Sequence, residues 1–155
     1  MEIMGMDDLK GSWEVLKITV DSGASDSVGP LGLAPGVPRR ETEVSKRGLE
    51  YTVANGGKVV NKGEKEVPMI TEEGEKASMT FQMADINKPL ASVRRMCEAG
   101  NRVVFDEEGS YIENKKTGRK TGMQKERGVY VLTVKVPKAM EESREMGFIR
   151  LEELI

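Results

Sequence analysis

Apolar and polar side chains alternate along several short runs of this chain. In the first run, residues 13–20, Leu16, Ile18 and Val20 share one face, and the run ends abruptly in the turn-forming residues 21–25. A period of two residues is typical of a β-strand with one buried face. The same reasoning predicts strands at residues 66–71, 77–86 and 128–137, whereas residues 115–127 read as a charged connection.

Two pairs of β-rich runs are separated by turn sequences. Glu50–Val53 and Lys58–Asn61 flank Asn55-Gly56-Gly57, and Asn-Gly between such runs is a strong hairpin signal. A second hairpin is predicted for residues 102–114, around the turn at 106–109. Three prolines and three glycines within residues 29–38 predict an irregular loop.

Only one segment has helical character. Residues 89–100 begin with proline, end with glycine and place Leu90, Val93, Met96 and Cys97 on one face. Cys97 is therefore expected to be a buried structural thiol rather than a nucleophile. Many short strands with one short helix predict a mainly β protein, a barrel or a sandwich.

The chain length suits one domain. We expect a flexible lead-in at residues 1–12, a single domain at 13–137 and a C-terminal segment at 138–155. That last segment is open to three interpretations: a helix, a tail that pairs at a dimer interface, or a disordered remnant. Apolar residues make up 37% of the chain and aromatic residues 5%, a thin core that would gain from a partner subunit.

Composition excludes several kinds of chemistry. The chain has no histidine, so Ser-His-Asp and Cys-His catalysis and histidine-ligated zinc are impossible within it, and no metal or cofactor is predicted. Acid–base chemistry must come from carboxylates, lysine or tyrosine. The net charge of −2 predicts no nucleic-acid partner, and no apolar run approaches membrane-spanning length. A single cysteine and the absence of a signal peptide favour a reducing, cytoplasmic location.

The most informative residues follow the first predicted strand. Asp21 comes directly after apolar residues, so the strand would hold its carboxylate rigidly, and Ser22, Gly23 and Ala24 complete an Asp-Ser-Gly-Ala sequence. A small hydroxyl residue can fix the loop, and a glycine permits close approach by another chain. The alternative is a plain turn, because aspartate, serine and glycine are frequent in turns. A four-residue motif in which some positions accept more than one residue type, as this one does, arises by chance in about 1% of chains this long.

Asp-Ser-Gly-Ala is a signature of aspartic proteases, which need two carboxylates that share one proton. This chain holds a single such motif, because Lys116-Thr117-Gly118 lacks the acid. A second copy of Asp21 would therefore come from a homodimer with two-fold symmetry. The hairpin tip at Ala54, Asn55, Gly56 and Gly57 is the candidate flap over bound peptide, with an ordinary surface hairpin as the alternative.

In the order and spacing of its motifs, the chain resembles the protease segment of copia-type retrotransposon polyproteins, a retropepsin-like family. The resemblance covers roughly residues 13–134 and rests on four segments: 20–25, 53–63, the Leu-Ala-Ser-Val helix region at 89–105, and 128–132. It implies a closed acid-protease β-barrel that cleaves its own polyprotein as a homodimer and is inhibited by pepstatin-like compounds. Asp21 would be catalytic, Ser22, Gly23 and Ala24 would support the site, and residues 54–57 would contact substrate.

The chain departs from the family pattern in three respects. It lacks zinc-knuckle and integrase motifs, as expected of an excised domain, a domesticated copy or a fragment, and it differs at two short segments. Asp26-Ser27-Val28 stands where copia-type elements often carry a histidine, and Ile86-Asn87-Lys88-Pro89 lacks the glycine that retroviral proteases carry before their helix. Two other interpretations remain: a retropepsin-fold module that dimerises or binds peptides without cleaving them, and an unrelated β domain with a turn at Asp21. Cleavage-site preference cannot be predicted, because specificity pockets are built from scattered residues.

Overall fold

The computed structural model describes residues 13–53 and 55–138, so the predicted lead-in (1–12), Ala54 and residues 139–155 lie outside the described residues. In chain order the elements are β1 (Trp13–Asp21), β2 (Val28–Pro30), α2 (Glu43–Lys46), β3 (Glu50–Thr52), β4 (Lys58–Val60), β5 (Glu64–Thr71), β6 (Lys76–Ala84), β7 (Leu90–Ser92), α3 (Val93–Glu98), β8 (Asn101–Val104), β9 (Ser110–Asn114), β10 (Lys120–Glu126) and β11 (Val129–Pro137).

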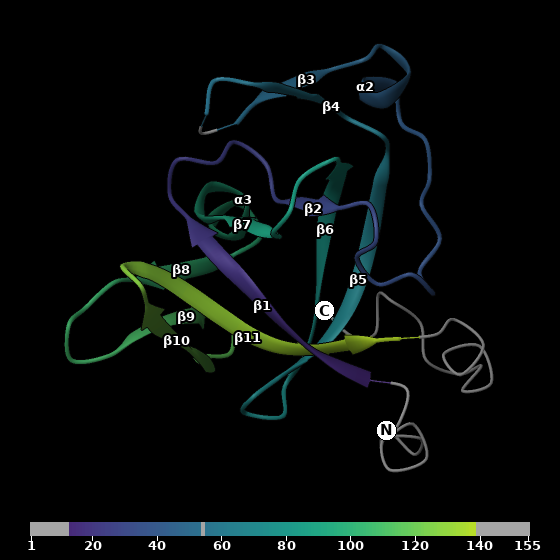
Figure 1. The fold of residues 1–155 in the computed structure, drawn as a ribbon. Helices are drawn as coiled ribbons and strands as arrows, with labels where there is room; N and C mark the ends of the chain where they lie inside the picture. The colour runs from purple at the N-terminus through teal and green to yellow at the C-terminus, as the bar shows by residue number, and fades with distance from the viewer. Residues whose placement is uncertain (1–12, 54, 139–155) are drawn as a thin grey trace.

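Six strands form a closed barrel, one of the two mainly β architectures that the strand pattern predicts (Figure 1). Their order around the barrel is β1-β7-β2-β6-β5-β11, and β11 closes it by pairing with β1. Strand β1 is parallel to β7 and antiparallel to β11, whose register joins Trp13 to Pro137. Strands β10, β9 and β8 continue the sheet outward from β11, while β3 and β4 form a separate hairpin.

The barrel core consists of the inward-facing residues of these strands. Ile18, Val67, Phe81, Met83 and Val136 are fully enclosed or nearly so, and they come from four different strands. In β1 the predicted face is confirmed: Ile18 and Val20 are buried, and Leu16 packs against the same cluster. Burial of each such side chain contributes about 1.5–3 kcal/mol relative to exposure.

The prediction of one helix over residues 89–100 is wrong in two respects. Leu90–Ser92 is strand β7, which lies between β1 and β2, and helix α3 begins only at Val93. Hydrogen-bonded partners on both sides outweigh the local helical pattern of these three residues. Cys97 is exposed, contrary to the expectation of a buried thiol, and Met96 is the helix residue that reaches the core.

Three further elements differ from the sequence prediction. Strand β2 includes Gly29 and Pro30, at the start of the predicted irregular loop, because it pairs with β6 and β7. A second helix, α2, begins with a capping box in which the side chains of Thr42 and Ser45 each accept a hydrogen bond from the other's backbone N–H. Residues 120–126, predicted as a charged connection, form strand β10 between β9 and β11. Only Met123 of this strand is buried, so its sequence lacks a continuous apolar face.

A buried lysine holds the Pro-Gly-rich loop before α2 against the barrel. Lys65 is 5% exposed, and its Nζ donates to the carbonyl oxygens of Leu33 and Ala34 at 2.8 and 3.1 Å. Burial, assisted by nearby Arg39, lowers the pKa of the Lys65 ammonium. Neither helix in the described part of the chain has the length and apolarity that crossing a membrane would require.

Candidate active site

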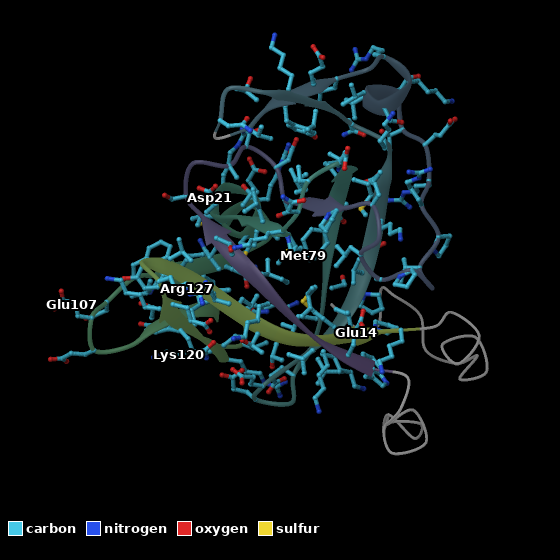
Figure 2. All side chains as sticks on the ribbon, viewed as in Figure 1. Glu14, Asp21, Met79, Glu107, Lys120 and Arg127 are labelled. Carbon is cyan, nitrogen blue, oxygen red and sulfur yellow. The ribbon has the colours of Figure 1, made fainter. Side chains whose placement is uncertain are left out.

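Asp21 is the last residue of β1 and lies at one end of the barrel (Figure 2). Strand β1 has neighbours on both sides, and its parallel register with β7 sets Asp21 opposite Ser92. The carboxylate is only partly buried, so solvent reaches it. Its Oδ1 accepts a hydrogen bond from the backbone N–H of Gly23 at 2.8 Å, which fixes the side chain against its own loop.

Ser92 supports the loop that follows Asp21. Its side chain is fully buried, and its Oγ donates to the carbonyl oxygen of Ala24 at 2.7 Å. Its backbone N–H donates to Oγ of Ser27 at 2.9 Å, so two bonds join the loop to β7. The same Oγ accepts from the backbone N–H of Arg95 and caps α3. One side chain therefore couples the loop to the helix.

Helix α3 follows strand β7 directly, so the segment that precedes it is residues 90–92. The apolar pair that precedes α3 is Leu90-Ala91, and the next residue is Ser92, not glycine. Residues 86–89, where the sequence comparison sought a glycine, lie before β7. The Ser92 hydroxyl and the Ser92 backbone N–H both support the loop.

The small residues after Asp21 leave space around it. Ser22 and Gly23 are exposed, and Ala24 is partly buried. A Cβ added at Gly23 would meet only Oδ1 of Asp21, at 3.4 Å, which is an ordinary contact. Contacts within the described residues therefore do not require glycine here, whereas close approach by a second chain would.

Asp26 has structural partners on both carboxylate oxygens. Oδ1 accepts from Nε and Nη2 of Arg95 at 2.8 and 2.6 Å, and Oδ2 accepts from the hydroxyl of Tyr51 at 3.1 Å. The hydrogen bond and charge of Asp26 raise the pKa of the Arg95 guanidinium. Asp26 thus ties α3 and the predicted flap hairpin to the loop that carries Asp21.

Tyr51 and Asn61 anchor the base of that hairpin. Nδ2 of Asn61 donates to the Tyr51 hydroxyl at 3.0 Å and to Oε1 of Gln82 at 2.8 Å, and Oδ1 accepts from the backbone of Gly63. Burial, with a further contribution from Asp26, raises the pKa of Tyr51 to about 12. Sequence reasoning missed Tyr51, Asn61 and Arg95, because no local pattern marks residues that meet only after folding.

The predicted flap is a hairpin in the structure. Strands β3 and β4 pair antiparallel, and the turn between them is held by the bond from the Gly57 N–H to Oδ1 of Asn55 at 2.8 Å. Gly56 has a φ of 85°, which glycine adopts readily. Figure 1 shows this hairpin at the same end of the molecule as the loop that follows β1.

Within residues 13–53 and 55–138, no group of three or more acidic, cysteine or histidine side chains is placed to hold a metal ion. No protein-family model, curated protein or solved structure matches this chain. The function is therefore inferred from the geometry around Asp21 and from the sequence resemblance.

Proposed function

We propose that the protein is an aspartic endopeptidase of the retropepsin type, active as a homodimer in which each subunit contributes Asp21. One observation carries the proposal: a solvent-accessible carboxylate ends a barrel strand, on a loop fixed by the buried Ser92. A rigidly held but accessible carboxylate is what an acid–base catalyst requires. The hairpin anchored through Tyr51 lies at the same end of the barrel and supports a role as flap.

The chemistry needs two such carboxylates. In the dimer, two Asp21 side chains would face each other across the two-fold axis and hold one proton between them. The ionised carboxylate takes a proton from a water molecule, whose oxygen attacks the peptide carbonyl carbon. The protonated carboxyl group donates to the carbonyl oxygen. When the tetrahedral intermediate collapses, the C–N bond breaks and a proton passes from the dyad to the leaving amine.

The exposed loop supports the dimer arrangement. Ser22 and Gly23 are exposed, and no contact within the subunit requires glycine at position 23. Identical loops meeting at a two-fold axis would form an isologous contact, in which small residues allow the two carboxylates to approach. The hairpin at Asn55, Gly56 and Gly57, with Ala54, would then close over an extended peptide and exclude water.

The test is peptide cleavage at pH 4–6 by wild-type protein and by Asp21→Asn, with and without pepstatin. We expect wild type to cleave and pepstatin to inhibit it, and Asp21→Asn to lose activity by at least about a thousandfold, because it cannot activate water. Asp85→Asn is the matched control, since Asp85 is an exposed aspartate outside the loop, and it should retain full activity.

Cleavage that persists in folded Asp21→Asn would refute the proposal. Absence of cleavage at every protein concentration, from wild type shown to be folded by circular dichroism, would favour a retropepsin-fold module that binds or dimerises without catalysis. Peptide length and composition should be varied, because the substrate preference is not predicted.

A further inference from the structure

A groove that does not include Asp21 is lined by residues 77–80 of β6, by helix α3 and by strands β8–β10. Its volume is about 570 Å³, and Met69, Met79, Met96, Ile112 and Leu132 contribute its apolar lining. Asp21 does not line it, whereas Asp26 and Arg95 do. The groove is therefore distinct from the Asp21 carboxylate, although Asp26, on the loop that follows β1, lines it.

One wall of the groove is an unpaired strand edge. Strand β2 covers β6 only at residues 82–84, and residues 77–80 line the groove. The N–H of Gln82 bonds to Ser27 on the β2 side, and that of Met83 bonds to Gly63 on the β5 side. Main-chain N–H and C=O groups of residues two positions apart point to the same side of a strand. Because the N–H of Gln82 points away from β5, the main-chain groups of Thr80 and Ser78 also point away from β5. No described strand pairs with them there.

Such an edge is a template for an extended peptide. Main-chain N–H and C=O groups at Ser78 and Thr80 can pair with an added strand, and alternate side chains of that strand would point towards the apolar lining. Helix α3 contributes Arg95 and Met96 to the groove lining, and its C-cap residue Ala99 also lines the groove. An open strand edge and a helix that line the same partly apolar groove suit the binding of one peptide strand.

Charge specifies the occupant further. Glu66 lines the groove and is the Cα partner of Thr80, so the two side chains share a face of the sheet. Glu66 has no hydrogen bond or ion pair to another described residue. The unpaired Glu66 carboxylate in the groove lining favours a peptide that carries lysine or arginine at the position facing Glu66.

Side chains of the β5–β6 turn bond to residues close in sequence to Thr121, which lines the groove. Oε2 of Glu73 accepts from the backbone N–H of Gly122 at 2.9 Å, and Glu75 forms an ion pair with Arg119 at 2.7 Å. These contacts join the β5–β6 turn to β10. The β5–β6 turn and β10 are therefore fixed relative to each other before any ligand arrives, which lowers the cost of binding.

We propose that this groove binds an extended peptide segment, with apolar side chains at alternate positions and a basic residue beside Glu66, by strand addition to β6. This binding is independent of the proposed protease activity. It would also occur in Asp21→Asn, where no cleavage can consume the peptide.

The probe is a fluorescein-labelled octapeptide of alternating valine and threonine with one central lysine, titrated with the full chain of Asp21→Asn by fluorescence anisotropy. Two further forms of the peptide carry N-methyl groups on alternate residues. In one form the methyl groups block the N–H groups on one edge of the extended peptide, and in the other form they block those on the opposite edge. We expect the form methylated on the edge that faces β6 to bind at least about tenfold more weakly, because it loses main-chain hydrogen bonds. Unmethylated peptide that does not bind, or both methylated forms binding as tightly as it does, would overturn the proposal.

Charge reversal tests the position of the basic residue. Glu66→Lys should weaken the lysine peptide by about fivefold and strengthen a glutamate-containing counterpart by a similar factor. The matched control is Glu107→Lys on the exposed turn before β9, well away from the groove in Figure 2, and it should change neither affinity. An identical response of the two variants would contradict a role for Glu66.

Thr80→Pro removes an edge N–H that is not bonded to β5, and proline is tolerated on strand edges. We expect it to keep its far-ultraviolet circular dichroism and lose peptide binding. If the folded variant binds peptide as wild type does, the edge is not the site. If wild type self-associates through this edge and binds no peptide, the occupant is a second copy and the proposal is wrong.

Discussion

Ser92 connects three parts of the structure through one hydroxyl group. It donates to Ala24, caps helix α3 and is completely shielded from solvent. Ser92→Ala should lower the free energy of unfolding by about 1–3 kcal/mol, because the Ala24 carbonyl and the helix N-terminus each lose a partner. Urea unfolding measures this, with exposed Ser22→Ala as the control expected to change stability by under about 0.5 kcal/mol. Equal effects of the two variants would contradict the supporting role of Ser92.

Gly63 shows what a single backbone position requires. Its φ is 110°, and a Cβ there would lie 2.5 Å from the carbonyl oxygen of Arg40. Gly74 also has a positive φ, of 83°, but a Cβ there would meet nothing within 4 Å. Gly74→Ala should therefore cost about 1 kcal/mol and Gly63→Ala at least about 2 kcal/mol more. Thermal unfolding measures the loss of stability in the two variants. Similar losses would mean that the backbone near Arg40 shifts to accommodate the added Cβ at little cost in free energy.

The β3–β4 hairpin depends on its anchor at Tyr51. The pKa of Tyr51 is raised to about 12, so between the ordinary value near 10 and 12 the folded state keeps a proton that the unfolded state has lost. The stabilisation is complete below pH 10 and is lost as pH rises through 12. Wild-type stability should therefore fall more steeply over pH 10–12 than that of Tyr51→Phe, as urea unfolding at each pH would reveal. Parallel curves would contradict the raised pKa.

The same anchor predicts an effect on function. Tyr51→Phe removes the hydroxyl that joins the hairpin to Asp26, while the ring keeps its packing. If the hairpin is the flap, KM for peptide should rise by about threefold to tenfold with a smaller change in kcat, because the flap binds substrate but does not touch the reacting atoms. A fall in kcat alone would argue that the hydroxyl acts on the carboxylates instead.

At the scale of the whole molecule, the proposed activity belongs to a pair of chains. Specific activity should fall on dilution below the dimer dissociation constant. Mixing wild type with an equal amount of Asp21→Asn and allowing subunits to exchange should leave about half the activity per wild-type chain, since mixed dimers hold one carboxylate. Adding Asp85→Asn instead should cause no loss. Activity that is unaffected by both dilution and mixing would exclude the dimeric site.

The sequence by itself determined much of the strand pattern. The face of β1, the β3–β4 hairpin with its Asn-Gly turn, the β8–β9 hairpin and strand β11 all follow from local alternation and turn residues. These features depend on neighbours in sequence, because burial on one side of a strand imposes a period of two. The position of Asp21 at the end of a buried strand was predicted in the same way.

Tertiary structure alone decided the rest. Residues 90–92 are a strand because β1 and β2 lie on either side of them, and β10 exists because β9 and β11 supply its hydrogen bonds. Lys65 is buried because two carbonyl groups of a distant loop receive its ammonium. The contacts of Ser92 with Ala24 and of Tyr51 with Asp26 join residues 68 and 25 positions apart. Local periodicity records which side of a segment is buried, but the partner that buries it is set by the topology of the barrel.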